Sequence, residues 1–154
     1  MYVYQAEAFG DVGATEQDDV KIGDLAAVSA TRILVAERDS EEGGSHKKVY
    51  AVDLSKATDI SGRDQFGGKT LEQVSSSDLK KAGVEYATKT MVVDLARLGF
   101  RPDKFEGLAI VNPTTLAVVN DNDFGVSAID SRGNVVRSSA MPRLVVIRVP
   151  QTIQ

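Results

Sequence analysis

The sequence lacks cysteine, and this absence excludes a disulfide framework and any thiolate metal site. It also has few basic clusters. The longest is His-Lys-Lys at 46–48, the formal net charge is -4 and the pI is about 5.0. Because a nucleic-acid-binding surface needs lysine and arginine to neutralise phosphates, that class of protein is excluded.

Long apolar runs are absent too, since none approaches the roughly 18 residues of a membrane-spanning helix. Residues 1–9 have neither the basic segment nor the apolar core of a signal peptide. We therefore expect no membrane span and no export signal in this chain. What is present, 154 residues of which 42% are hydrophobic and 26% charged, is typical of a globular domain with its own core.

An internal repeat organises the chain. Residues 21–28, Lys-Ile-Gly-Asp-Leu-Ala-Ala-Val, recur without a gap at 104–111 as Lys-Phe-Glu-Gly-Leu-Ala-Ile-Val, 83 residues further along. The likeness continues to the polar ends at 37–39 and 120–122. Two copies of one unit are therefore predicted.

Each copy contains four segments with the pattern of β-strands. They are 24–28, 32–36, 48–54 and 90–95 in the first copy, and 107–111, 116–119, 126–129 and 144–149 in the second. Four strands make one blade of a β-propeller. The sequence thus predicts an all-β fold: a single domain over 1–154 with about two four-stranded antiparallel blades, copy one at 21–95 and copy two at 104–149.

The first copy carries a long insertion at 55–89, within which 71–83 has the pattern of a short helix. Residues 5–19 are expected to form a polar loop that follows an edge strand at 1–4. Because propellers take typically about 4 to 8 blades, two blades do not close a ring. The chain is then the C-terminal part of a longer protein with the other blades missing, or copies self-associate to complete the ring, or the two sheets pack as a sandwich.

Acidic side chains are expected to converge where the first two strands of each copy form a hairpin. With Pro113 and Thr114 at the turn, Glu106 faces Asp121, and the same register sets Asp24 opposite Glu37. Like charges in these positions are tolerated when a cation or an arginine lies between them. Oxygen ligands suit Ca²⁺, so a calcium site is predicted from Glu106, Asn120, Asp121, Asn122 and Asp123.

Two plainer interpretations stand beside the metal site. The sequence Asn-Asp-Asn-Asp-Phe-Gly at 120–125 is also typical of a polar turn at a strand end. In the first copy, Glu37, Arg38 and Asp39 contain their own counter-ion, which favours a structural salt bridge. The single histidine, His46, lies in a loop, and no nucleophile elbow accompanies it to form a Ser-His-Asp triad.

These residues resemble the phytase-like family, which is described by an esterase-like activity. The resemblance rests on 104–109 and 118–125, with 23–26, 34–39 and 48–54 in the first copy, and it covers roughly 22–149. It implies a propeller found mainly in extracytoplasmic bacterial proteins, either periplasmic or secreted. The chain departs from the fuller family pattern because it has neither the preceding blades nor an export signal.

The resemblance also implies a function, the hydrolysis of a phosphorylated small molecule at an acidic calcium site. By that analogy Glu106, Asp121 and Asp123 hold the ion and carry the catalysis, and Arg38 or Lys104 draws in the phosphate. The substrate-binding residues are then Arg38, Lys104, Glu37 and Asp39. The alternative is a non-catalytic propeller module, in which calcium only fixes the loops and the face binds a partner.

Overall fold

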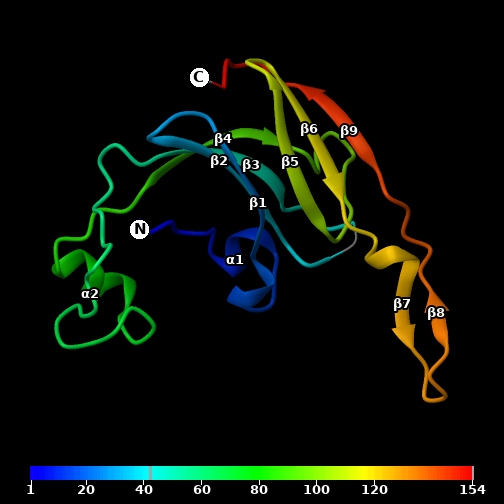
Figure 1. Cartoon of the computed structure of the whole chain (residues 1–154), viewed down its shortest axis with the longest axis horizontal. Coiled ribbons are helices and arrows are strands. Elements are labelled where there is room, and N and C mark those ends of the chain that lie inside the picture. The colour runs from blue at the N-terminus through cyan, green and yellow to red at the C-terminus, as the bar shows by residue number, and fades with distance from the viewer. Residues whose placement is uncertain (42, 154) are drawn as a thin grey trace.

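The computed structural model describes residues 1–41 and 43–153. Over this part of the chain most regular structure is β, arranged as two antiparallel sheets that pack face to face, with a separate two-stranded hairpin projecting from the body (Figure 1). The prediction of an all-β fold is confirmed. The described strands form open sheets rather than a closed ring.

The first sheet has the order β1-β2-β3-β4 and contains the four strands predicted for copy one. β2 is buried along most of its length because apolar side chains on both of its faces are covered. The alternation Ile33, Leu34, Val35, Ala36 supplies one pair of residues to each face. The strand bounds are β1 Lys21–Ala27, β2 Arg32–Arg38, β3 Lys47–Asp53 and β4 Thr88–Asp94.

The second sheet has three strands in the order β5-β6-β9, so the prediction of a four-stranded second blade is wrong. The predicted third strand, β7, pairs with β8 in the projecting hairpin, and β9 takes the place beside β6. The connecting turn explains this, because Asp130 Oδ1 accepts the N–H groups of Arg132 and Asn134, both at 2.8 Å, and closes a short local loop. The bounds are β5 Phe105–Asn112, β6 Thr115–Asn120, β7 Val126–Ile129, β8 Val135–Arg137 and β9 Leu144–Arg148.

The remaining segments form short helices and loops around the first sheet. α2, Ser76–Lys81, lies inside the predicted helix, and the Ser75 hydroxyl caps it by accepting the Asp78 N–H at 3.1 Å. The segment 5–19 contains α1, Phe9–Val12, and a 3₁₀ turn, Gln17–Asp19, where only a loop was predicted. Residues 1–4 form no strand, although backbone hydrogen bonds join them to Ile60 and Ala87. No helix in the described residues is long and apolar enough to cross a membrane.

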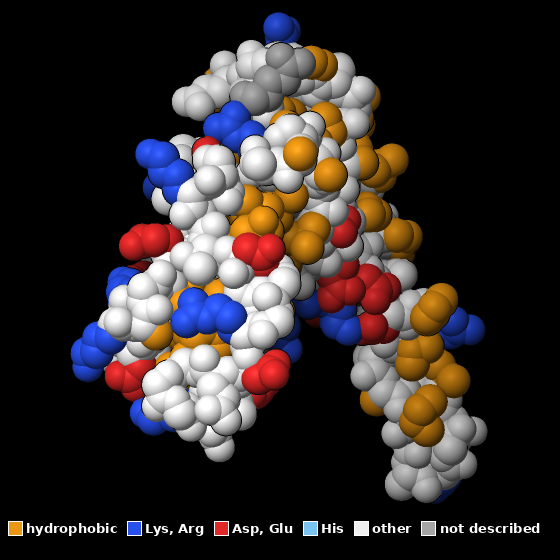
Figure 2. All heavy atoms as spheres, turned by 60° about the vertical axis from the view of Figure 1, so that its left-hand side comes forward, with side chains coloured by type: hydrophobic (Ala, Val, Ile, Leu, Met, Phe, Trp, Pro, Cys, Tyr) orange, Lys and Arg blue, Asp and Glu red, His pale blue; other side chains and the backbone are white. Residues whose placement is uncertain are grey.

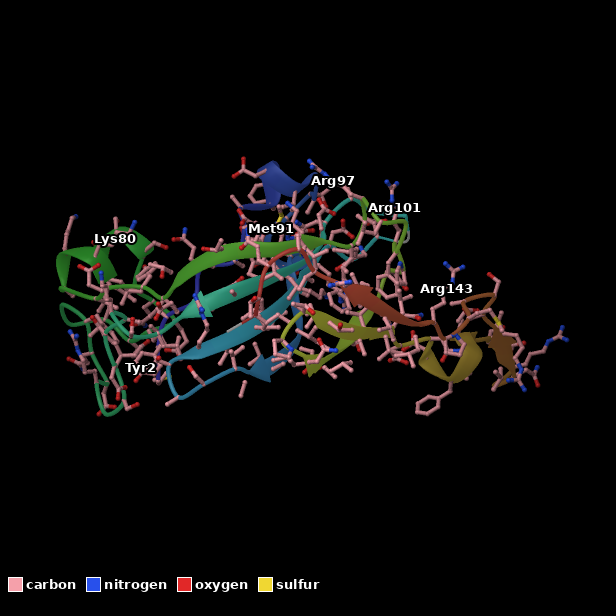
Figure 3. The ribbon with its side chains drawn as sticks, turned by 90° about the horizontal axis from the view of Figure 1, so that it is seen from above. Tyr2, Lys80, Met91, Arg97, Arg101 and Arg143 are labelled. Atoms are coloured by element: carbon pink, nitrogen blue, oxygen red, sulfur yellow. The ribbon has the colours of Figure 1, made fainter. Side chains whose placement is uncertain are left out.

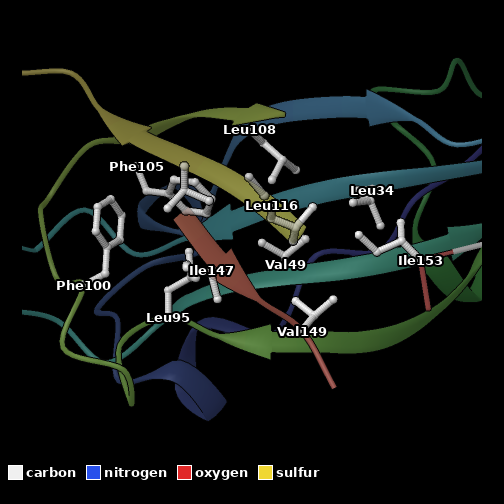
Figure 4. Packing of buried hydrophobic residues seen from close by; sticks show 12 residues of the cluster. Leu34, Val49, Leu95, Phe100, Phe105, Leu108, Leu116, Ile147, Val149 and Ile153 are labelled. Carbon is white, nitrogen blue, oxygen red and sulfur yellow. The ribbon is translucent and has the colours of Figure 1, made fainter. Parts of the chain in front are cut away.

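The main hydrophobic core lies between the two sheets (Figure 4). The rings of Phe100 and Phe105 meet edge to face, with centroids 5.8 Å apart. At one edge β1 and β5 approach closely, and the Asp24 carboxylate accepts the Leu108 N–H at 2.7 Å. The buried members of this core are Leu34, Ala36, Val49, Leu95, Phe100, Phe105, Leu108, Leu116, Val118, Ile147, Val149 and Ile153.

Candidate functional site

The acidic rim lies where the hairpins β1-β2 and β5-β6 open, but the predicted pairs across it are wrong. Glu106 falls in a bulge between Phe105 and Gly107 and therefore has no partner residue on β6. In the first copy Asp24 pairs with Ala36. Each strand pairing is one residue out of the predicted register and then bulges, which moves every carboxylate away from the residue it was expected to face.

Glu106 contacts the other copy of the repeat instead. Arg38 at the end of β2 donates from Nη2 to Glu106 Oε1 at 2.6 Å and from Nη1 to the Asp103 carbonyl at 3.1 Å. Its side chain is 8% exposed, so this ion pair is shielded from water on the arginine side. The cation that neutralises Glu106 is therefore an arginine of the protein.

Residues 120–123 also have protein partners. Lys104 forms an ion pair with Asp123, and this hydrogen bond raises the pKa of the Lys104 ammonium. The Asp123 N–H donates to Asp121 Oδ1 at 2.9 Å. Asn120 is buried, and its Oδ1 accepts the Arg143 N–H at 2.7 Å. Acidic and basic side chains gather at the base of the projecting hairpin (Figure 2).

These contacts decide how well the five predicted ligands fit a calcium ion. Glu106 and Asp123 are neutralised by Arg38 and Lys104, and the Asn120 oxygen is taken by a backbone N–H. Among the described residues, no three His, Asp or Glu side chains come together in a group that could hold a metal. The five residues therefore do not present one common set of free oxygens, and calcium binding stays a prediction.

Glu37, predicted to bind substrate, is fully buried below the rim. It accepts hydrogen bonds from Tyr4 Oη at 2.6 Å, the Glu7 N–H at 3.0 Å and Lys89 Nζ at 3.2 Å, and it pairs with His46 Nε2 at 2.8 Å. Burial alone would raise the pKa of Glu37, but these partners together lower it to about 2. Such a carboxylate stabilises the fold by fixing the N-terminal segment to the sheet.

Arg38 and Asp39 are also buried, at 6% and 3% exposure. Asp39 forms an ion pair with Lys47 and accepts the His46 N–H at 2.8 Å. Burial lowers the pKa of Lys47, although Asp39 opposes that shift. The arrangement supports the structural interpretation of 37–39, because a ligand would have to displace these internal partners to reach the side chains.

A cavity of about 240 Å³ opens beside Asn120, and sequence reasoning did not find it. Arg101 and Arg143 line it, and both side chains point to the same side of the molecule (Figure 3). Neither arginine forms an ion pair with a carboxylate of the described residues. No sequence signal marked them, since they lie 42 residues apart and outside the matching positions of the repeat. The cavity is lined by Gly43, Gly99, Arg101, Pro102, Asp103, Asn120, Ser139, Ala140, Met141 and Arg143.

A comparison with known families decides the relationship of the chain. The family model named Phytase-like, described as esterase-like activity of phytase, matches residues 1–124. The chain belongs to the Phytase-like family. No curated protein and no solved structure gives a significant match. The match to the Phytase-like family ends at the base of the hairpin, so it includes Glu106, Asp121, Asp123 and Arg101, while Arg143 lies beyond it.

Proposed function

We propose that this chain binds a phosphorylated small molecule in the cavity lined by Arg101 and Arg143, as part of a phytase-like phosphoester hydrolase. One observation carries the proposal: two guanidinium groups from separate segments line one cavity without a carboxylate partner among the described residues. A guanidinium presents a planar fork of N–H donors that matches phosphate oxygens. The Phytase-like match supports a phosphoester as the ligand.

The surroundings of the cavity suit an anionic ligand of small size. Asp103 lines the cavity too, but its Oδ1 accepts the Lys104 N–H at 2.9 Å, which engages part of that carboxylate. The Ser139 side chain adds a hydroxyl group that can donate a hydrogen bond. Asp121 directly follows the cavity residue Asn120 and is exposed. In the proposed hydrolysis Asp121 takes a proton from water, the water oxygen attacks phosphorus, and the bond from phosphorus to the alcohol oxygen breaks. Asp121 then gives the proton to the departing alcohol oxygen, so that phosphate and a neutral alcohol leave.

Calorimetric titration with inorganic phosphate and a phosphomonoester tests the binding proposal. We expect Arg101→Ala and Arg143→Ala each to weaken phosphate binding about 10-fold or more, because each removes a charged hydrogen bond of on the order of 1.5 to 3 kcal/mol. Arg97→Ala is the matched control. Arg97 pairs with Asp94 at 3.3 Å, its side chain is 84% exposed, and it does not line the cavity.

Two results would contradict the binding proposal. If Arg97→Ala weakens binding as much as the cavity variants do, phosphate is attracted by general surface charge only. If the unchanged protein binds neither probe, the cavity is not a phosphate site. Either outcome leaves the family assignment intact, because that assignment depends on the sequence match alone.

Calcium-dependent catalysis is a second candidate function. The oxygen-bearing side chains at 120–123 support the ion, and the family description supports only the esterase-like catalysis. We assign no reaction step to the ion. Titration with Ca²⁺, then a phosphoester turnover assay, separates this candidate from the non-catalytic module: binding without turnover supports the module. If Glu106→Gln, Asp121→Asn and Asp123→Asn all leave calcium binding and turnover unchanged, both the metal site and the catalytic roles fail.

We also propose that the protein acts outside the cytoplasm, in the periplasm or after secretion. Its membership of the Phytase-like family supports this location.

A further inference from the structure

The repeat allows each sheet position in one copy to be compared with its equivalent in the other. The 83-residue offset places Leu25, Ile33 and Val35 on the positions of Leu108, Leu116 and Val118. We call the sheet face with these side chains the front face of each copy. The opposite face, the back face, carries Ala26, Leu34 and Ala36 in copy one and Ala109, Ala117 and Val119 in copy two.

The third strands extend this correspondence. Ala36 pairs with Val49 on β3, and its equivalent Val119 pairs with Leu144 on β9. In the same way Leu34 pairs with Ala51, and Ala117 pairs with Val146. Leu144 and Val146 therefore belong to the back face of copy two, as Val49 and Ala51 belong to the back face of copy one.

The main core lies between one back face and one front face. The back face of copy one, with Leu34, Ala36 and Val49, packs against the front face of copy two, with Leu108, Leu116 and Val118. Within one molecule, therefore, the two repeat units already pack with the back face of one against the front face of the other. In the described residues, the front face of copy one and the back face of copy two have no partner sheet. Part of that front face is covered by other segments, because Tyr4, Leu54 and Ala87 pack over the buried residues Val35, Tyr50 and Val52.

Equivalent residues differ in exposure accordingly. On the front face, Leu108 is 8% exposed and its equivalent Leu25 is 56% exposed. On the back face, Val49 is 0% exposed and its equivalent Leu144 is 71% exposed, with Val146 at 63%. Leu25, Leu144 and Val146 are therefore open to solvent, although they occupy the same positions of the pattern as buried or partly buried residues. Val35 is an exception, because at 2% exposure it is as buried as its equivalent Val118 at 1%.

We propose that the back face of copy two binds the front face of copy one in a second molecule of this chain. The front face of copy one has an apolar hollow of about 290 Å³ for the incoming side chains, lined in part by Ile22, Leu25 and Ile33. Tyr2 and Tyr4 also line this hollow. The contact joins two different surfaces, so it is head-to-tail and repeats from molecule to molecule. It does not depend on the proposed phosphate site.

Sedimentation velocity over a range of protein concentrations tests this contact. We expect the unchanged protein to self-associate as its concentration rises, and Leu25→Glu or Val146→Glu to remain monomeric. Val135→Glu is the control, because Val135 is 53% exposed on the hairpin and belongs to neither face. All three changes lie at exposed positions, and Leu144→Glu provides a second variant on the back face.

Mixing the two variants gives the sharpest result. Leu25→Glu keeps an intact back face and Val146→Glu keeps an intact front face, so an equal mixture should form heterodimers and nothing larger. A mixture that stays monomeric overturns the head-to-tail contact. An unchanged protein that stays monomeric at its highest soluble concentration, or a control variant that loses association, overturns the second copy as the partner.

Discussion

Glu37 shows how the role of a single residue depends on what surrounds it. In the sequence it is one of three charged residues at a strand end, a pattern that favours a structural salt bridge, while the family resemblance implies substrate binding. In the structure its carboxylate is fully buried and has four partners from three segments: Tyr4 and Glu7 of the N-terminal segment, His46 and Lys89. A buried carboxylate with this many donors is an internal support, because losing it leaves several polar groups without a partner.

Replacing Glu37 with glutamine should destabilise the protein by on the order of 3 kcal/mol, since Lys89 and His46 lose a buried acceptor charge. Glu85→Gln is the control, because Glu85 is exposed. Chemical denaturation at neutral pH measures the free energy of unfolding of both variants. Equal stability of the two would show that the carboxylate of Glu37 contributes nothing.

The same residue predicts a dependence on pH. Its pKa is about 2 in the folded protein, below the ordinary value of 4.5. A lowered pKa contributes stability that is fully present above the unfolded value and is lost as the pH falls through the folded value. The unchanged protein should therefore lose more stability than Glu37→Gln between about pH 4.5 and about pH 2. Parallel curves for the two proteins would contradict this.

At the scale of elements, hydrophobic alternation was enough to predict the strands but not their partners. β1 to β4 and β5, β6 and β9 lie where the alternation places them. The register was missed because the pairing is one residue out of the predicted register along most of each hairpin, and it shifts again at a bulge near the open end. A bulge leaves no mark on the hydrophobic pattern. The strand β7 was assigned to the wrong sheet. It pairs with β8 instead, because the turn between them is short and closing it costs little entropy.

The contacts of the candidate site could not be predicted from the sequence. The sequence predicted carboxylates at one rim, because both copies end their second strand with polar residues, and the site itself stays a prediction. It did not show that Arg38 pairs with Glu106, since that contact joins the two copies and exists only when the sheets are packed. For the same reason it did not show Arg101 and Arg143 at one cavity.

At the scale of the whole molecule, the packing of the two sheets brings these groups together. The main core lies between the sheets, and beside it β1 crosses close to β5 at Gly23. A Cβ atom on Gly23 would overlap the carbonyl oxygen of Phe105, so only glycine permits this approach. Glu106, which forms the ion pair with Arg38, directly follows Phe105 at this crossing.

Gly23→Ala should therefore destabilise the protein by about 1 to 3 kcal/mol, because the added methyl group forces β1 and β5 apart. Gly10→Ala is the matched control: a Cβ at Gly10 meets nothing within 4 Å, and alanine in α1 should leave stability unchanged or slightly higher. Thermal unfolding compares the two variants, and phosphate titration of Gly23→Ala reports on the cavity. If Gly23→Ala is as stable as Gly10→Ala, the close crossing does not hold the sheets together. If it is less stable and binds phosphate more weakly while remaining folded, the packing of the sheets positions Arg101 and Arg143.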